Sequence, residues 1–103
     1  MHPLIQEKRA AIAALCQRYR VRHLEVFGSA ARGDDFDLAS SDADFLVEFE
    51  PRSQLPPLEE FFGFQADLSR LLQRSVELIE AGAVRNPYVL ADINRTREVV
   101  YAA

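Results

Sequence analysis

The sequence predicts an α/β domain with two layers, in which helices pack on a small β-sheet. Apolar residues recur every three or four positions near the start of the chain and again after its middle, which is the spacing of amphipathic helices. Short runs with apolar residues at every second position lie between these segments, which is the spacing of β-strands. Helical and extended segments alternate along all 103 residues, so we expect a single domain over 1–103.

Charge and composition exclude several classes of protein. The formal net charge of -4 argues against a general nucleic-acid or membrane-surface binder. Cys16 is the only cysteine, so no disulfide can form within the chain. No apolar run approaches the length of a membrane span, and the first residues lack the apolar core of a signal peptide. We therefore expect a cytoplasmic protein that binds neither membranes nor nucleic acid directly.

The first expected elements are an amphipathic helix over 3–20 and a strand over 21–27. Cys16 lies on the apolar face of this helix. A small core residue explains it better than a nucleophile, because no base partner is identifiable. His23 is expected to be structural or at the surface, because a single imidazole without companions seldom forms a metal site.

The turn at Gly28 and Ser29, directly after this strand, is the central feature of the sequence. Glycine takes backbone angles that other residues avoid and lets a ligand approach the main chain. Ser29 offers a hydroxyl group, and Ala30, Ala31 and Arg32 favour a short helix whose first amides can face an anion. The turn therefore predicts a phosphate site, in which Arg32 either reaches the phosphate or pairs with a nearby aspartate.

Two carboxylates, Asp42 and Asp44, follow the turn. A strand over 42–49 would place both on one face, with its apolar residues on the other. Neighbouring carboxylates repel each other unless a cation lies between them, and a divalent metal beside a phosphate site is typical of phosphoryl or nucleotidyl transfer. The acidic loop over 34–41 does not match a calcium-binding EF-hand, since Ser40 stands where that loop needs glycine.

After a short proline-rich segment, a long helix is expected from Leu58 to Leu72. Its apolar stripe consists of Phe61, Phe62, Leu68, Leu71 and Leu72. Glu59 and Glu60 are expected on its solvent-exposed face. Phe64 falls off the apolar stripe, where it could contact a partner.

A short strand is expected over 75–80, with Val76 and Leu78 on one face and Glu77 on the other. If Glu77 shares the face of Asp42 and Asp44, it completes a cluster of three carboxylates; otherwise it is a solvated side chain. Convergence of these side chains requires that the two strands are neighbours. Asn86 and Pro87 then predict the cap and first turn of a helix through Thr96, and residues 99–101 predict a last edge strand.

The sequence resembles the minimal nucleotidyltransferases of the DNA polymerase beta superfamily. The resemblance rests on FGSAARGD at 27–34, on SDADFLVEF at 41–49 and on NPY at 86–88, and it covers nearly the whole chain. It implies a nucleotidyltransferase fold like the polymerase beta palm, with a small mixed sheet and packed helices. The family's third carboxylate, commonly aspartate, matches Glu77 here, and the loop before Asp42 is longer than is usual in the family.

The resemblance also implies a chemistry. ATP would bind at Gly28, Ser29 and Arg32. Two Mg²⁺ ions, or Mn²⁺ in their place, would be held by the catalytic residues Asp42, Asp44 and Glu77. AMP would pass from ATP to a hydroxyl group, with a tyrosine of a HEPN-type ribonuclease toxin as acceptor. The chain would then be the antitoxin, in a hetero-oligomer with that toxin.

Two other hypotheses stay open. The chain could be an antitoxin that neutralises its toxin by contact alone, with a vestigial nucleotide site. It could also be a small-molecule nucleotidyltransferase subunit. The intact pair Asp42 and Asp44 favours catalysis, because a vestigial site has no physical reason to keep two mutually repelling carboxylates together.

Overall fold

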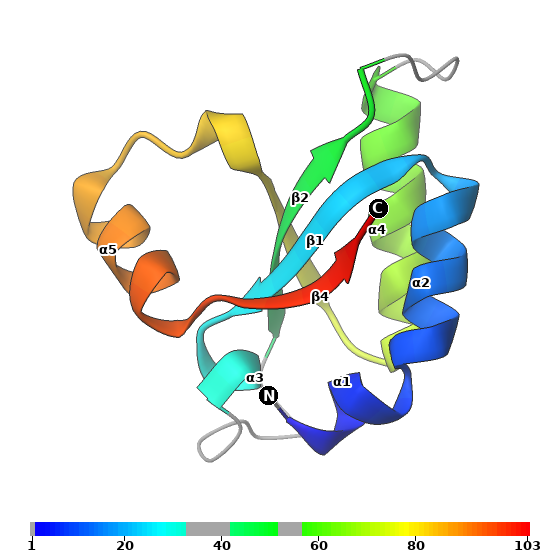
Figure 1. The fold of residues 1–103 in the computed structure, drawn as a ribbon, viewed down its shortest axis with the longest axis horizontal. Coiled ribbons are helices and arrows are strands. Elements are labelled where there is room, and N and C mark those ends of the chain that lie inside the picture. Colours follow the sequence, from blue (N-terminus) through cyan, green and yellow to red (C-terminus); the bar gives the residue numbers. More distant parts are fainter. Residues whose placement is uncertain (1, 33–41, 52–56) are drawn as a thin grey trace.

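The computed structural model describes residues 2–32, 42–51 and 57–103, without the side chains of Ser29 and Arg32. The strands in this part of the chain are β1 (Val21–Phe27), β2 (Ala43–Phe49), β3 (Val76–Glu80) and β4 (Glu98–Ala102). They form one sheet in the order β3-β2-β1-β4 (Figure 1). β1 is antiparallel to β2 and β4, whereas β3 is parallel to β2. The predicted α/β fold with a small mixed sheet is therefore confirmed, with β4 as the expected edge strand.

The helices are α1 (Pro3–Glu7), α2 (Arg9–Arg18), α3 (Ser29–Arg32), α4 (Pro57–Leu72), the 3-10 turn η1 (Ala81–Ala83) and α5 (Pro87–Thr96). The single helix expected over 3–20 is instead divided at Lys8, which leaves helical geometry. The predicted cap of α5 is confirmed, since the Asn86 side chain accepts a hydrogen bond from the Tyr88 N–H at 2.9 Å. No helix in the described ranges is long and apolar enough to cross a membrane. The loop compared with an EF-hand and most of the proline-rich segment lie outside the described residues.

The main core lies between one face of the sheet and the helices α1, α2 and α4 (Figure 1). Its fully buried side chains come from both layers and include Ile5, Ile12, Cys16, Leu24, Val26, Phe45, Val47, Phe64 and Leu68. Burial of Cys16 raises the pKa of its thiol to about 12. The prediction that Cys16 is a core residue is confirmed, since such a thiol stays protonated and unreactive at neutral pH.

The face of α4 that packs on the core differs from the expected one. Its buried residues are four positions apart: Glu60, Phe64, Leu68 and Leu72. Phe64 is fully buried and meets the ring of Tyr19 edge to face, with centroids 5.8 Å apart. The expected partner contact at Phe64 and the expected exposure of Glu60 are therefore wrong, and Phe62 is the exposed phenylalanine instead.

A glycine explains how α4 packs against the end of α2. An added Cβ at Gly63 would lie 3.0 Å from Cε1 of Tyr19, so the ring rests directly on the helix backbone. The Tyr19 hydroxyl also donates a hydrogen bond to Asp67, one turn further along α4. These contacts select the side of α4 that carries Phe64.

The opposite face of the sheet carries a smaller apolar cluster. Phe27 of β1, Leu46 of β2 and Ile93 of α5 are buried in it, and Ile79 and Val84 pack against them. α5 therefore lies on the other side of the sheet from α2 and α4 (Figure 1). This second face also carries Asp44 of β2 and Glu77 of β3, because these residues alternate with the residues of the main core.

Candidate functional site

One row of residues crosses three strands of the sheet. β1 pairs Phe27 with Asp44, and β2 pairs Asp44 with Glu77. Residues that lie opposite each other in neighbouring strands point to the same face. The expectation that the strands of Asp44 and Glu77 are neighbours is confirmed, and the two carboxylates share the face opposite the main core.

Gly28 follows Phe27 and brings the main chain against Asp44. Its φ of +70° is in the left-handed region, which glycine adopts without strain. A Cβ at this position would lie 2.9 Å from Oδ2 of Asp44, closer than real Cβ contacts come. The Gly28 carbonyl accepts a hydrogen bond from the Ala31 N–H at 3.1 Å and so leads into α3. Glycine thus keeps open a space that any other side chain would fill.

The N–H of Gly28 has a partner on α5. It donates a hydrogen bond to Oγ1 of Thr96 at 2.8 Å, and the Thr96 hydroxyl donates to the Asp92 carbonyl at 3.0 Å. Gly28 itself therefore leaves room for a bound phosphate but has no free N–H to donate to it. The hydrogen-bond donors must come from other groups of the turn.

Asp44 is the electrostatic centre of the site. The pKa of Asp44 is raised from 3.8 to about 6, first by burial, then by the charge of Glu77 and by a hydrogen bond with Glu77. The charges of Asp42 and Asp92 act in the same direction. Asp42 and Glu77 are exposed, while Asp44 is half-buried. In the protein without a cation, the ionised form of Asp44 is therefore disfavoured.

The residues fit a divalent cation by their chemistry. In the described ranges, no group of three His, Cys, Asp or Glu side chains is already arranged as a metal site. Asp44 and Glu77 nevertheless bring carboxylate oxygens together, and these are the ligands that Mg²⁺ prefers. A cation between them would relieve the repulsion between their charges. Gly28 brings the main chain directly against Asp44, so a group bound at this turn would lie beside that carboxylate.

Ser29 and Arg32 belong to α3, but their side chains are outside the described part of the structure. Their predicted contacts with phosphate therefore stay predictions. The same holds for the alternative pairing of Arg32 with an aspartate of the loop at 34–41, which also lies outside the described residues.

Two residues beside the site, Asp92 and Thr96, were not anticipated from the sequence. They lie four positions apart on α5, next to Ile93, the one buried residue of this helix. Polar residues that flank the buried position of an otherwise exposed helix point toward the packing partner. That pattern was available in the sequence, but it does not reveal which element the helix covers.

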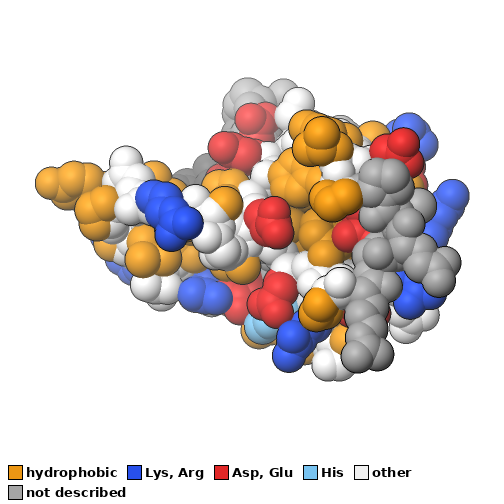
Figure 2. Space-filling model, turned by 90° about the horizontal axis from the view of Figure 1, so that it is seen from above, with side chains coloured by type: hydrophobic (Ala, Val, Ile, Leu, Met, Phe, Trp, Pro, Cys, Tyr) orange, Lys and Arg blue, Asp and Glu red, His pale blue; other side chains and the backbone are white. Residues whose placement is uncertain are grey.

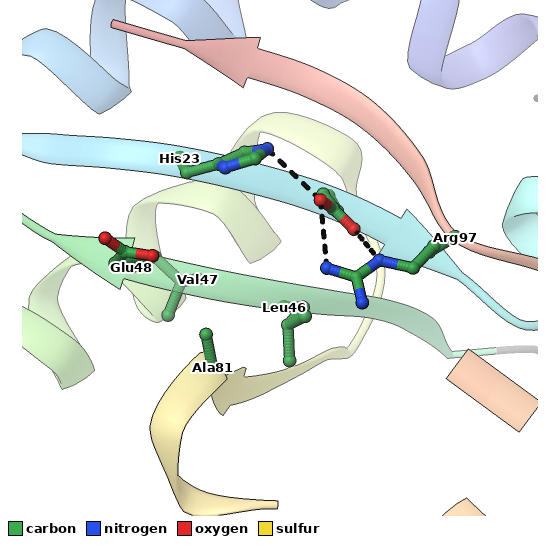
Figure 3. Close-up of a pocket in the computed structure, with 7 residues that line it drawn as sticks. His23, Leu46, Val47, Glu48, Ala81 and Arg97 are labelled. Atoms are coloured by element: carbon green, nitrogen blue, oxygen red, sulfur yellow. Dashed lines mark hydrogen bonds and ion pairs between the residues drawn. The ribbon is translucent and has the colours of Figure 1, made fainter. Parts of the chain in front are cut away.

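A buried ion pair joins the end of α5 to β1 (Figure 3). Glu25 is 6% exposed and accepts hydrogen bonds from Nε and Nη2 of Arg97, the latter at 3.1 Å. His23 Nε2 lies 3.1 Å from the same carboxylate, so this histidine, expected to be structural or at the surface, makes a structural contact. The adjoining cavity of about 40 Å³ is far too small for a nucleotide. This cluster therefore fixes α5 in place.

An apolar groove lies near the start of α4. Its volume is about 410 Å³, and its lining includes Pro57, Leu58, Phe61, Phe62, Leu78 and Ile79. Figure 2 shows hydrophobic side chains gathered on this side of the molecule, with acidic side chains between them and the protruding α5. Leu58 is 71% exposed and Phe62 is 57% exposed. This surface is a second feature that a function has to explain.

Comparison with known proteins points to one family. Residues 8–100 match the model of the nucleotidyltransferase domain. MJ0128 from Methanocaldococcus jannaschii, provisionally named a protein adenylyltransferase, is 38% identical over 79 residues, which cover 77% of this chain and 76% of that protein. The protein adenylyltransferase MntA from Thermococcus cleftensis is 34% identical over 87 residues, which cover 84% of this chain and 80% of that protein.

Solved structures share the fold. A provisionally assigned minimal nucleotidyltransferase superimposes with a TM-score of 0.73 and 27% identity, over 95% of each chain. An MNT antitoxin, in complex with a tri-AMPylated HEPN toxin from Shewanella oneidensis, superimposes with a TM-score of 0.65 over 96% of this chain and 73% of that one. At 14% identity, the second likeness concerns the fold alone.

Proposed function

This chain belongs to the nucleotidyltransferase domain family, and we propose that it transfers AMP from ATP to a hydroxyl group of a partner protein. The observation that carries the proposal is the contact between Gly28, Asp44 and Glu77. It joins an open backbone turn, suited to phosphates, to a pair of carboxylates suited to a divalent cation. Neither feature alone points to nucleotide transfer, whereas their direct contact does.

Each residue has a defined part in this proposal. The triphosphate lies along the turn at Gly28, which has no side chain of its own, and Ser29 and Arg32 contribute a hydroxyl group and a positive charge. Asp42, Asp44 and Glu77 would hold two Mg²⁺ ions, or Mn²⁺ in their place. When bound, such ions offset the negative charge that develops on the transferring phosphoryl group. The acceptor hydroxyl group loses its proton to solvent, and its oxygen forms a bond to the α-phosphorus of ATP as the bond to pyrophosphate breaks.

The proposed acceptor is a tyrosine hydroxyl of a HEPN-type toxin, and the chain is its antitoxin in a hetero-oligomer. Two similarities support this proposal. The MntA relative is named a protein adenylyltransferase, and a structure with the same fold was solved with a tri-AMPylated HEPN toxin. A protein that docks its own hydroxyl group at the carboxylates needs no enclosing small-molecule cleft.

Exposed apolar side chains favour a second candidate function, neutralisation by contact alone. Leu58 and Phe62 border the groove at α4, and Tyr88 on α5 is 85% exposed. Apolar surface of this kind often marks a protein interface. Such contact and catalysis are compatible, so complex formation by itself does not separate the two functions.

Intact-mass measurement separates them. The chain is incubated with ATP, Mg²⁺ and the candidate toxin, and the toxin is weighed. We expect one or more adenylyl additions with the parent chain and with Glu59→Gln, a control that removes an exposed carboxylate of α4. We expect none with the double variant Asp42→Asn, Asp44→Asn, or when EDTA removes the metal. If no addition appears and the double variant still neutralises the toxin as well as the parent, the contact-only function is correct.

A further inference from the structure

The turn at Gly28 is held by both of its backbone polar groups. The Gly28 N–H donates to Thr96 Oγ1 at 2.8 Å, and the Gly28 carbonyl accepts from the Ala31 N–H at 3.1 Å. The first bond joins positions that are 68 residues apart in the sequence, whereas the second is local. The orientation of the peptide that enters the turn therefore depends on the end of α5.

Thr96 is well suited to hold this peptide in one orientation. Its hydroxyl donates to the Asp92 carbonyl at 3.0 Å, so its proton is committed and its lone pairs face the Gly28 N–H. The Thr96 side chain is half-buried, which limits competition from water. A hydroxyl group that both donates and accepts a hydrogen bond fixes the direction as well as the distance of its two partners.

The end of α5 is itself anchored to the sheet on both sides of Thr96. Ile93 is fully buried against Phe27 and Leu46, and Arg97 binds the buried carboxylate of Glu25. Thr96 lies between these two anchors in the sequence. It therefore acts as a rigid part of the second face of the sheet, although it ends a largely exposed helix.

The hydrogen bond has a direct consequence for Asp44. The backbone of Gly28 lies so close to the Asp44 carboxylate that an added Cβ would approach Oδ2 to 2.9 Å. A rotation of the peptide before Gly28 would change the left-handed φ of +70° and, with it, the space between the turn and this carboxylate. The position of Thr96 thus determines the shape of the space in which we place the triphosphate.

We propose that Thr96 is a positioning residue for nucleotide binding: it acts through the Gly28 N–H and holds the turn open beside Asp44. The inference rests on the proposed function, because it assigns the turn to the triphosphate. Thr96 does not contact the nucleotide in this proposal. Its hydroxyl group sets the geometry of the turn before ATP arrives.

Three variants test the proposal. Thr96→Val keeps the β-branched shape and removes the hydroxyl group, while Thr96→Ser restores it. Arg95→Gln is the control, because it removes the neighbouring exposed ion pair with Asp92 and leaves the Gly28 contact intact. Two quantities are measured at a temperature where all variants are folded: the exchange of the Gly28 amide proton without nucleotide, and the dissociation constant of ATP with Mg²⁺.

We expect Thr96→Val to expose the Gly28 amide to exchange and to weaken ATP binding roughly two- to tenfold, the range for one hydrogen bond. Thr96→Ser should restore both values, and Arg95→Gln should leave both at the parent level. A purely structural role would instead lower the melting temperature and leave the ATP affinity of the folded protein unchanged. Either that result or an unchanged Gly28 exchange rate in Thr96→Val overturns the proposal.

These measurements also separate failure of the inference from failure of the proposed function. Amide exchange and ATP binding are both observed without an acceptor protein. A parent chain that binds ATP but adenylylates no toxin contradicts the proposed function alone. A parent chain that transfers AMP, with a Thr96→Val variant that binds ATP as tightly as the parent, contradicts the inference alone.

Discussion

Replacing Asp44 by asparagine should stabilise the metal-free protein at neutral pH. Asp44 is half-buried beside Glu77, and its ionised form is disfavoured by burial first and by the charge of Glu77 second. Asparagine has nearly the same shape and no charge, and its amide can still donate a hydrogen bond to Glu77. The substitution therefore removes the unfavourable charge while it preserves the packing.

The size of the effect follows from the pKa. A pKa of about 6 for Asp44, against 3.8 ordinarily, corresponds to about 3 kcal/mol between the two protonation states. We expect about 1 to 3 kcal/mol, because solvent partly screens the half-buried Asp44 and the exposed Glu77 can move away and relieve part of the repulsion. For a domain of this size, that difference raises the melting temperature by roughly 5 to 20 °C.

The sign depends on pH. Between 3.8 and about 6 the folded protein binds more protons at Asp44 than the unfolded chain does, so its stability falls as the pH rises. The stabilising contribution of protonated Asp44 is complete below pH 3.8 and is lost as the pH rises through about 6. Asp44→Asn and the parent should therefore be similarly stable in acid and should differ most above about pH 7.

Urea unfolding in EDTA, repeated from pH 4 to pH 8, measures this difference. Asp42→Asn is the matched control, because Asp42 is exposed and its charge is a lesser cause of the raised pKa of Asp44. It should stabilise the protein less than Asp44→Asn does. Added Mg²⁺ should stabilise the parent at pH 8 and leave Asp44→Asn unchanged. A difference between parent and Asp44→Asn that stays constant across this pH range would refute the reasoning.

Three further substitutions test separate contacts. Gly28→Ala should lower the free energy of unfolding by about 1 to 3 kcal/mol through backbone strain and should weaken binding of ATP with Mg²⁺; unchanged affinity in calorimetric titration would contradict the phosphate site. Arg97→Gln should lower the free energy of unfolding by about 2 to 4 kcal/mol, since Glu25 stays buried without its cation, and its control Arg95→Gln by less than about 1 kcal/mol. Equal losses of stability in urea unfolding would argue that the pair of Arg97 with Glu25 does not anchor α5. Phe64→Ala should lower the free energy of unfolding by about 3 to 5 kcal/mol and Phe62→Ala by less than about 1 kcal/mol. The reverse order in thermal unfolding would indicate that Phe62, as expected from the sequence, is the buried residue of α4.

Most of the fold could be predicted because its signals are local. The strand before Gly28 is a continuous extended run, and the cap at Asn86 is a short-range hydrogen bond followed by proline. The shared face of Asp44 and Glu77 also follows from the two-residue period of strands, once β2 and β3 are neighbours. That pairing itself came from the family resemblance, since two short strands can be arranged in several orders.

The rotation of α4 could not be predicted from its own sequence. Phe61, Phe62 and Phe64 lie so close together that apolar stripes on either side of the helix match the helical period. The choice is made by Tyr19, which comes from the end of α2 and packs against the backbone at Gly63. The rotation of α4 is therefore set by a contact between two different elements, and the hydrophobic pattern of α4 alone does not reveal that contact.

The geometry of the candidate site also depends on contacts between different elements. The Gly-Ser turn and the Asp-x-Asp pair are close in the sequence, but the Gly28 N–H is held by Thr96 and the pKa of Asp44 is raised partly by Asp92. Both residues belong to α5, whose place over the sheet depends on Ile93 and on the pair of Arg97 with Glu25. The two motifs therefore define which groups can bind phosphate and metal, whereas α5 holds the Gly28 N–H and adds a small part to the raised pKa of Asp44, whose main cause is burial. A protein with both motifs but without an equivalent of α5 needs another way to orient the peptide before its glycine.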